Sequence, residues 1–378
     1  MGAGPVPIPH AVARANSVVI NHLGATMERV ISNLKEMARY AFQTRADKIM
    51  GVGGPASAAM EMAVTNLLWT GQKCLCLKTG TFSGRLGEMA ACVGADVTTL
   101  EAETGKPVTA EAVRRALAKK RFDVVTLVQG ETSCGVLNGE LPEIARLAQA
   151  HGALTIVDAV VTLSTMSLEM DRWGLDAVVT GGQKGLSSIP GVSLIGFSDR
   201  AWRVIEKRPL PPTHWCFDAI RAQRFWGEHQ YHYTAPVPGI LALYEALRLV
   251  CEEGLAARHE RHRISSISLQ AGLGAMGLEL FIPAPHRLNS VIAIRVPTGV
   301  DAKSVLAYMS RKFRVEISGS FGLDVVRIGQ MGEQCRSHNL FKVLYATGMS
   351  FRHFGVELDV SGGLAELERT LTREQEFE

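Results

Sequence analysis

The chain has 378 residues, of which 47% are hydrophobic, and its formal net charge is +3. It can bury a large core and is expected to divide into two domains, or into one domain with a smaller appendage. Its charges are scattered rather than gathered in runs, which argues against nucleic acid or an anionic membrane as a partner.

From about residue 30 to 200, apolar strand-like runs alternate with amphipathic helix-like stretches, the pattern of βαβ units around a mostly parallel sheet. Helices are expected at 27–42, 57–69, 109–119 and 140–151, and strands at 73–78, 95–99, 123–129, 153–158, 175–180 and 193–197. Residues 207–233 lack clear periodicity and predict an irregular segment. Residues 236–275 predict a long helical region that breaks near Gly254.

The rest of the chain predicts a smaller α+β unit, with strands at 290–296, 313–318 and 325–329 and helices at 301–312 and 336–354. We therefore expect an N-terminal segment (1–20), a large domain (21–260) and a small C-terminal domain (261–378).

The seven cysteines are odd in number and lack CxxC spacing, as is typical of reduced thiols in the cytosol. No signal peptide opens the sequence, and no run reaches about 18 uninterrupted apolar residues, so we expect a cytoplasmic protein without a membrane span. His259 and His262 lie on an Arg-rich helical stretch without a completing ligand pattern. They predict a solvated helical face and no metal site.

Lys184 stands in the segment Gly181-Gly-Gln-Lys-Gly185, just after an apolar strand. A lysine surrounded by apolar residues is poorly solvated, so part of its population is neutral. A neutral amine condenses with an aldehyde to form a Schiff base. Asp158 ends the preceding buried strand, where an acid could hold a pyridine nitrogen protonated, as pyridoxal phosphate enzymes require. Taken alone, Lys184 is more simply a surface lysine, and Asp158 is more simply an acid that caps the next segment. Taken together, they predict a pyridoxal phosphate site.

Two further patterns suit this chemistry. The stretch from Gly51 to Met60 is a glycine-rich turn that leads into a helix near Ser57, where free N–H groups can hold a phosphate, although such a turn is often only a turn. Arg327 lies within an apolar strand, and its forked donors suit a substrate carboxylate. A structural salt bridge is an equally good interpretation of this arginine.

Together these residues resemble the class V aminotransferases of fold type I, and within them the alanine–glyoxylate and serine–glyoxylate (serine–pyruvate) aminotransferase family. The resemblance runs from Gly4-Pro5 through 129–136, 157–160, 182–185, 190–191 and 231–237 to 327–329. It implies a mostly parallel seven-stranded sheet sandwiched by helices, with a smaller C-terminal α+β domain. It also implies pyridoxal 5'-phosphate as cofactor and a homodimer with its sites at the interface.

The resemblance assigns roles by position. Lys184 would bind the cofactor aldehyde and carry the proton as general acid and base, Asp158 would pair with the pyridinium, and Arg327 would hold the substrate carboxylate. Phe82 would stack on the ring, unless it is ordinary core. The other expected cofactor contacts are Ala56, Ser57, Ser133, Val160 and Gln183, with Tyr231 and Thr234 reaching over from the neighbouring subunit.

Two departures from the family pattern stand out. The phosphate loop reads Gly53-Gly-Pro-Ala-Ser57 where the family often has Ser-Gly-Ser-Gly-His or Gly-Thr-Gly, so the cup around phosphate and substrate is expected to be reshaped. The chain also begins almost at Gly4-Pro5, so an arm that wraps the partner is expected to be short or absent.

The expected reaction is ping-pong transamination from a small amino acid, such as alanine or serine, to an oxo acid such as glyoxylate or pyruvate. The alternative keeps the cofactor but changes the reaction: a pyridoxamine–pyruvate aminotransferase, a lyase or a desulfurase. Pyridoxamine–pyruvate enzymes resemble this chain but carry an acid in the phosphate loop, and none lies between Gly51 and Met60. A desulfurase needs a mobile loop cysteine, whereas Cys335 is predicted at the start of a helix. A module that binds the cofactor without catalysis, or binds none, is the remaining alternative.

Overall fold

A computed structural model describes residues 1–375 of the chain. Its larger sheet has seven strands in the order β1-β9-β8-β7-β4-β2-β3. Neighbouring strands from β3 to β8 pair in parallel, and only β9 runs against its two neighbours. The strands are β1 (Lys48–Gly53), β2 (Lys73–Lys78), β3 (Asp96–Glu101), β4 (Val124–Val128), β7 (Leu154–Asp158), β8 (Ala177–Gly181) and β9 (Val192–Phe197). This confirms the predicted mostly parallel, seven-stranded sheet.

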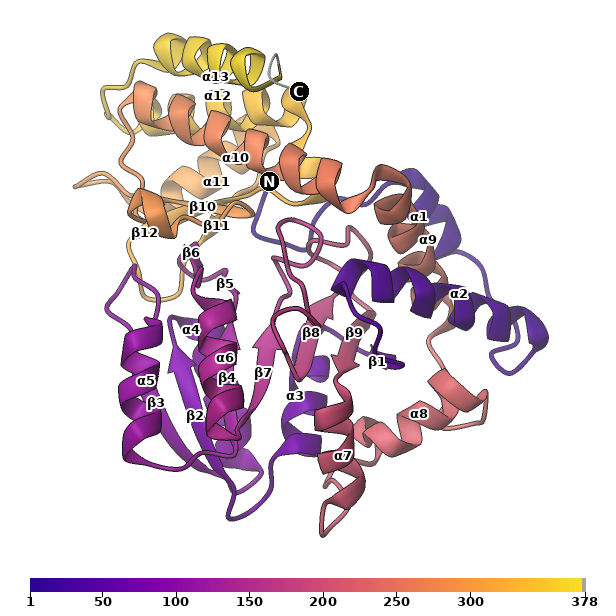
Figure 1. Ribbon diagram of the computed structural model, residues 1–378. Coiled ribbons are helices and arrows are strands. Elements are labelled where there is room, and N and C mark those ends of the chain that lie inside the picture. Colours follow the sequence, from indigo (N-terminus) through magenta and orange to yellow (C-terminus); the bar gives the residue numbers. More distant parts are fainter. Residues whose placement is uncertain (376–378) are drawn as a thin grey trace.

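Helices cover this sheet on both sides, with α3 packed against β8 and β9 and α4 against β2 and β4 (Figure 1). The helices of this part are α1 (His10–Ala15), α2 (Ala25–Phe42), α3 (Ala56–Leu67), α4 (Thr81–Cys92), α5 (Ala110–Lys119), α6 (Leu141–His151), α7 (Asp199–Lys207), α8 (Ala219–Glu228) and α9 (Val237–Glu253). A short 3₁₀ turn (Trp215–Phe217) precedes α8, and a two-stranded ribbon, β5 (Gly130–Glu131) with β6 (Val136–Leu137), follows β4.

A smaller unit lies above the carboxyl ends of the parallel strands (Figure 1). Its antiparallel sheet has the order β10-β12-β11, formed by β10 (Val291–Arg295), β11 (Ser318–Gly319) and β12 (Val325–Gly329). The helices here are α10 (Leu255–Met276), α11 (Ala302–Phe313), α12 (Ser337–His353) and α13 (Val360–Gln375), with 3₁₀ turns at Ala284–His286 and Gly332–Cys335. The N-terminal residues run between the two units, where Met1 O accepts a hydrogen bond from Gly329 N.

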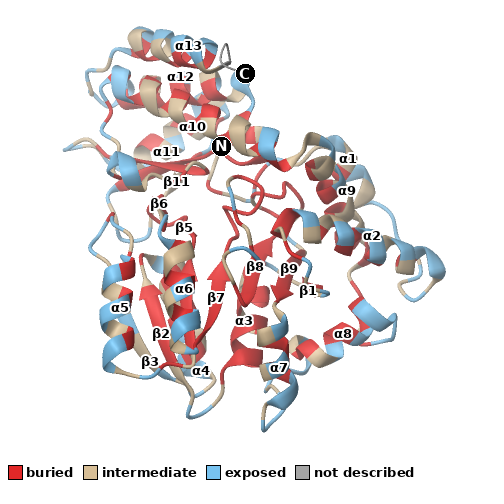
Figure 2. Cartoon of the chain, in the orientation of Figure 1, coloured by how far each residue is buried: buried red, intermediate tan, exposed pale blue. Residues whose placement is uncertain are grey.

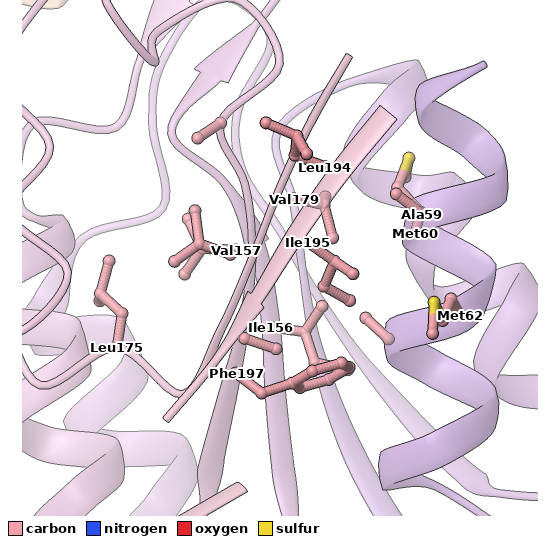
Figure 3. Packing of buried hydrophobic residues seen from close by; sticks show 14 of the residues in the cluster. Ala59, Met60, Met62, Ile156, Val157, Leu175, Val179, Leu194, Ile195 and Phe197 are labelled. Carbon is pink, nitrogen blue, oxygen red and sulfur yellow. The ribbon is translucent and has the colours of Figure 1, made fainter. Parts of the chain in front are cut away.

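Buried apolar side chains make one core for each sheet (Figure 2). The five residues of β4 and of β7 are all buried and mostly β-branched, as expected for parallel strands covered on both faces. On one face, Ile156, Val179 and Ile195 meet Met60 and Met62 of α3 (Figure 3). Each such side chain contributes about 1.5–3 kcal/mol on burial. The core thus fixes β7 and β8, the strands whose ends lead to Asp158 and Lys184.

The predicted elements mostly agree with the structure, including the break at Gly254 between α9 and α10, where φ is +80°. Four predictions were wrong. Residues 207–233 contain α8, and the start of the predicted turn at Gly51 belongs to strand β1. The segment 313–318 is the end of α11 and a loop that reaches β11 only at Ser318, and 256–263 is no solvated face. Arg258 and His262 on that stretch are buried, because they bond to segments far away in the sequence.

No helix in the described part of the chain is long and apolar enough to cross a membrane, and no cluster of potential metal ligands occurs among these residues. The predicted domain limits at residues 20 and 260 stay a prediction.

Candidate active site

Lys184 lies on the turn after β8, beneath the N-terminal segment. Its Nζ donates a hydrogen bond to the carbonyl oxygen of Ala3. The next residue, Gly4, has φ +97°, and a Cβ there would lie 2.5 Å from Cδ of Lys184. Burial, and next the positive charge of Arg327, lowers the pKa of Lys184 to about 8 against the opposing charge of Asp158. The lysine is therefore partly neutral near neutral pH and suited to nucleophilic attack.

Asp158 ends β7, beside the strand that leads to Lys184. The residue is only 5% exposed, and its Oδ1 accepts a hydrogen bond of 2.8 Å from Val160 N. Burial raises its pKa to about 7, helped by the charge of Glu131, whereas the hydrogen bond from Val160 and the charge of Lys184 oppose the rise. A carboxylate so poorly solvated is suited to a buried cationic partner. Since Asp158 and Lys184 each change the pKa of the other, the structure brings the two predicted residues together.

Phe82 and Ser133 are held by a buried acid that sequence reasoning missed, Glu131. This carboxylate, 0% exposed, accepts hydrogen bonds from Ser133 Oγ at 2.5 Å, Ser83 N at 2.9 Å and Ser83 Oγ at 2.8 Å. Phe82 N also lies 3.3 Å from it. The negative charge stands at the N-terminus of α4, where the helix dipole favours it. Glu131 is in the quoted segment 129–136, but its partners on α4 were not visible in the sequence.

The N-terminus of α3 lies at the end of the glycine-rich stretch, whose first part is strand β1 and not a turn as predicted. No side chain among residues 1–375 caps this helix, so its first N–H groups at Ala56 and Ser57 are available to an anion. The hydroxyl of Ser57 accepts a hydrogen bond of 3.0 Å from Arg85, whose guanidinium also lies 5.0 Å from the centre of the Phe82 ring. Arg85 was missed too, although its i,i+3 spacing from Phe82 gave a signal.

Arg327 lies on β12 and is 5% exposed. Its Nε donates to the carbonyl oxygen of Gly319 at 2.8 Å and its Nη1 to that of Thr132 at 2.5 Å. No carboxylate pairs with it among residues 1–375, so the structural salt bridge is not formed and the positive charge is available for an anion. Burial lowers the pKa of Arg327, and no described acid offsets this fully. Phe321 covers its guanidinium at 5.6 Å.

Tyr231 and Thr234 are not brought to the site within one chain. Tyr231 is 60% exposed and Thr234 is exposed as well. Instead, the hydroxyl of Tyr233 accepts a hydrogen bond of 3.4 Å from Gly53 N, at the glycine-rich stretch. The remaining predicted residues, Val160 and Gln183, are buried next to Asp158 and Lys184.

These residues fit pyridoxal phosphate. A partly neutral lysine, a desolvated acid and an aromatic side chain suit the aldehyde, the pyridine nitrogen and the ring. The free helix N-terminus beside Arg85 suits the phosphate. Two buried acceptors near the lysine turn, Thr180 Oγ1 and Gln183 Oε1, have no hydrogen-bond partner among the described residues. Unpaired buried polar atoms are rare in folded proteins, and a polar ligand would account for them.

Comparisons with known proteins agree with this geometry. The family model for class-V aminotransferases matches residues 10–346. Alanine–glyoxylate aminotransferase of Drosophila melanogaster is 35% identical over 372 residues, which cover 96% of this chain and 94% of the fly protein.

Solved structures are similar over nearly the whole chain. The ureidoglycine–glyoxylate aminotransferase of Bacillus subtilis superimposes with a TM-score of 0.94 at 31% identity, covering 98% of this chain and 97% of its own. The pyridoxamine–pyruvate aminotransferase of Mesorhizobium loti gives a TM-score of 0.95 at 26% identity, covering 99% of this chain and 96% of its own.

Proposed function

Because the chain belongs to the class-V aminotransferase family, we propose that it is a pyridoxal phosphate-dependent transaminase that moves the amino group of a small amino acid to an oxo acid such as glyoxylate. The observation that carries this proposal is the placement of two poorly solvated groups at the carboxyl ends of neighbouring parallel strands: Asp158 ends β7, and Lys184 lies on the turn after β8. The relatives from Drosophila melanogaster and Bacillus subtilis are named as glyoxylate aminotransferases, which supports the choice of acceptor.

When bound, pyridoxal phosphate supplies an aldehyde for the amino group and a ring that withdraws electrons from the substrate Cα. Lys184 would hold the aldehyde end of the cofactor, and its amine, when free, would take up and return the proton at the substrate Cα. Asp158 keeps the pyridine nitrogen protonated. Arg327 would hold the substrate carboxylate with the N–H groups, one each on Nη1 and Nη2, that remain beyond its bonds to Gly319 O and Thr132 O. The N–H groups of Ala56 and Ser57 bind the phosphate, helped by the charge of Arg85.

Three side chains would border the cofactor ring. Ser133, fixed by its hydrogen bond to Glu131, would offer its hydroxyl near the ring oxygen. Phe82 would stack on the ring, and Val160 would pack against it. Phe321 meets Phe82 edge to face, with ring centres 6.0 Å apart, and also covers Arg327. The loop that carries Phe321 thus stands where a substrate side chain would lie.

We also propose that the active form is a homodimer. Tyr231 and Thr234 are exposed on a single chain, while the family resemblance places them at the cofactor phosphate of the neighbouring subunit. Large apolar side chains exposed in the same single chain include Val18, Val19, Leu23, Leu210 and Trp215. Burying such a surface against a second copy would be favourable.

Mixing two inactive variants tests the shared site. Lys184→Ala and Tyr231→Ala chains, unfolded and refolded together, form hybrids in which one of the two sites has both native residues. Activity should return to about a quarter of the native value, as expected if random pairing makes half of the dimers hybrid with one site each. If each subunit used only its own Tyr231, no activity would return.

We place the enzyme in the cytoplasm. The free cysteines support this, since Cys74, Cys76, Cys134 and Cys335 are buried as thiols and none of the described cysteines forms a disulfide.

The choice of donor is tested by a half-reaction. Purified protein loaded with pyridoxal phosphate is mixed with alanine, serine, ureidoglycine, aspartate or pyridoxamine, and the loss of the aldehyde chromophore is followed. We expect small amino acids to react fastest.

The close structural match to a pyridoxamine–pyruvate aminotransferase favours pyridoxamine as the second candidate donor. The absence of an acid from Gly51 to Met60 argues against it. A response to pyridoxamine alone would select that reaction over amino-acid transamination. Sulfide release from cysteine would select a desulfurase, which the burial of Cys335 argues against; burial also raises the pKa of this thiol to about 11.

A further inference from the structure

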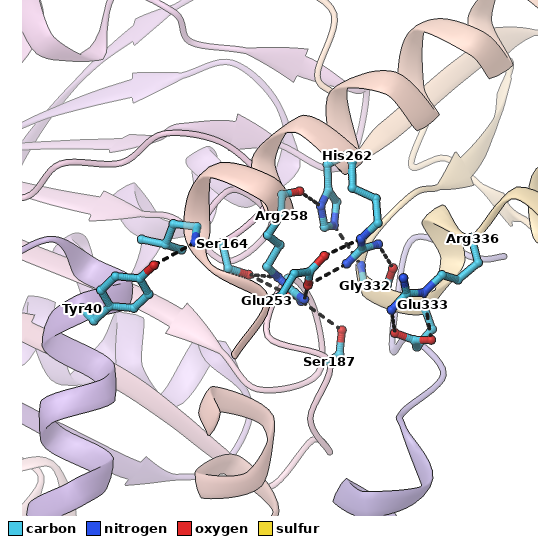
Figure 4. A network of polar contacts seen from close by, with 12 residues as sticks. Tyr40, Ser164, Ser187, Glu253, Arg258, His262, Gly332, Glu333 and Arg336 are labelled. Carbon is cyan, nitrogen blue, oxygen red and sulfur yellow. Dashed lines mark hydrogen bonds and ion pairs between the residues drawn. The ribbon is translucent and has the colours of Figure 1, made fainter. Parts of the chain in front are cut away.

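A partly buried polar network lies where α9 meets α10, outside the residues assigned to the cofactor (Figure 4). It joins Glu253, at the end of α9, with Arg258, Arg261 and His262 on the first turns of α10. The side chain of Arg258 is 5% exposed and His262 is fully buried. A buried arginine is costly unless every donor has a partner, so its contacts indicate what it is kept for.

The donors of Arg258 converge on the turn that carries Lys184. Its Nη2 donates to the carbonyl oxygen of Gly185 at 2.8 Å, and its Nε donates to Ser164 Oγ at 3.2 Å. Ser164 Oγ in turn donates to the same Gly185 oxygen at 2.8 Å. The carbonyl group next to Lys184 is therefore held from two directions.

The surroundings leave this turn little room. A Cβ on Gly185 would lie 2.4 Å from the carbonyl oxygen of Leu163. On the other side, a Cβ on Gly332 would lie 1.7 Å from Ser187 Oγ. Within the turn, Ser187 N donates to Lys184 O at 2.9 Å. Small displacements of Arg258 would therefore be passed to the backbone of Lys184.

The same network also holds the chain just beyond Arg327. Glu253 accepts from Arg258 at 2.7 Å and from Arg261 at 2.6 Å, and Arg261 Nη1 donates to Gly332 O at 2.8 Å. His262 Nε2 accepts from Gly332 N at 3.0 Å, while its Nδ1 lies 2.6 Å from Arg258 O. This pattern needs a neutral ring, and burial keeps the pKa of His262 well below its usual range. The first turns of α10 thus hydrogen-bond both to the turn that carries Lys184 and to the segment after β12.

We propose that Arg258 is a positioning residue for the transamination: by fixing the Gly185 carbonyl against α10, it sets the place of Lys184 relative to Arg327. This inference rests on the proposed function of Lys184. Arg258 itself touches neither substrate nor cofactor. Misplacement of a reacting group by about 1 Å can reduce a rate on the order of 100-fold, which is the scale of effect expected from the loss of this contact.

The test compares Arg258→Met with Arg263→Met. Arg263 lies on the same helix and is 42% exposed, and it pairs with Glu260 and Glu374 far from the turn. Three quantities are measured: kcat and KM of the loaded enzyme, the melting temperature, and backbone amide hydrogen exchange of the protein without cofactor. We expect Arg258→Met to lower kcat about 10- to 100-fold while KM changes less than about threefold. Exchange should become faster at Ser187 and Ser188 but not in β7.

The control should retain native kcat and native exchange at the turn. The proposal is overturned if the two variants behave alike, or if Arg258→Met speeds exchange in β7 as much as at the turn while kcat per folded molecule stays native. Should Arg258→Met not fold, Arg258→Lys decides, because a lysine keeps the charge but cannot reach Gly185 and Ser164 together. A reduced kcat at native melting temperature would then support the proposal, and a native kcat would overturn it.

A failure of the proposed function can be distinguished from a failure of the positioning role of Arg258. If Lys184→Ala keeps full turnover, the reaction assignment is wrong whatever Arg258 does. If Lys184→Ala is inactive and Arg258→Met behaves like the control, only the positioning role is wrong.

Discussion

Replacing Asp158 by Asn should stabilise the protein without cofactor while weakening cofactor binding. The carboxylate is buried, and its pKa of about 7 stands against an ordinary value of 3.8. That difference corresponds to at most about 4 kcal/mol of unfolding free energy lost at pH 8, because a charge is held where it is poorly solvated. Asparagine keeps an oxygen for the hydrogen bond from Val160 N but carries no charge.

The sign follows from proton binding. Between pH 4 and 7 the folded protein holds a proton on Asp158 that the unfolded chain has released, so this group's contribution to stability falls as pH rises and is lost above pH 7. Asp158→Asn removes this dependence. The unfolding free energy of the variant should therefore exceed that of the native chain by more at pH 8 than at pH 5, with the gap widening by about 2–3 kcal/mol.

Urea unfolding at both pH values, without cofactor, measures this gap, since groups other than Lys184, whose pKa the charge of Asp158 raises, titrate alike in the two proteins. A titration with pyridoxal phosphate supplies the second half of the prediction: the native protein should gain more stability from the cofactor than the variant does. Two results would show that Asp158 is not a desolvated acid suited to a cationic partner. One is a variant less stable than the native chain at pH 8, and the other is a difference in unfolding free energy that does not change with pH.

Three further predictions concern the other groups of the site. Glu131→Ala should lower the unfolding free energy by about 3–5 kcal/mol in urea, since it leaves buried donors unpaired, whereas the exposed Glu101→Ala should change it little. Arg85→Met should weaken pyridoxal phosphate binding about tenfold in a fluorescence titration, the scale of one charge-assisted hydrogen bond; unchanged affinity would remove Arg85 from the phosphate site. Arg327→Lys should slow the half-reaction with alanine about 100-fold but not that with ethylamine, which has no carboxylate, and equal losses for both would rule out carboxylate binding.

Local sequence signals located the centre of the site because they depend on neighbouring residues. The strands before Asp158 and Lys184 are fully buried and mostly apolar, and parallel strands bring their carboxyl ends to one edge of a sheet. This was enough to place the acid and the lysine together. The helix break at Gly254 was equally local, since glycine tolerates the φ of +80° found there.

The features that were missed or wrong depend on distant contacts. Glu131 is buried because α4 offers it donors from 48 residues away in the sequence. The stretch around Arg258 and His262 reads as polar, but Gly185 and Gly332 supply partners that allow its burial. The extent of β11, only two residues, is set by its pairing with β12. Patterns within a segment do not contain this information.

The central claim is that Lys184 Nζ binds the aldehyde of pyridoxal phosphate. The direct measurement is reduction of the loaded protein with borohydride at pH 8, near the pKa of the lysine, followed by mass spectrometry of its peptides. We predict one reduced adduct per chain, on the peptide that contains Lys184, and none in Lys184→Ala. An adduct on a different lysine, or no adduct in the loaded native protein, would contradict the account.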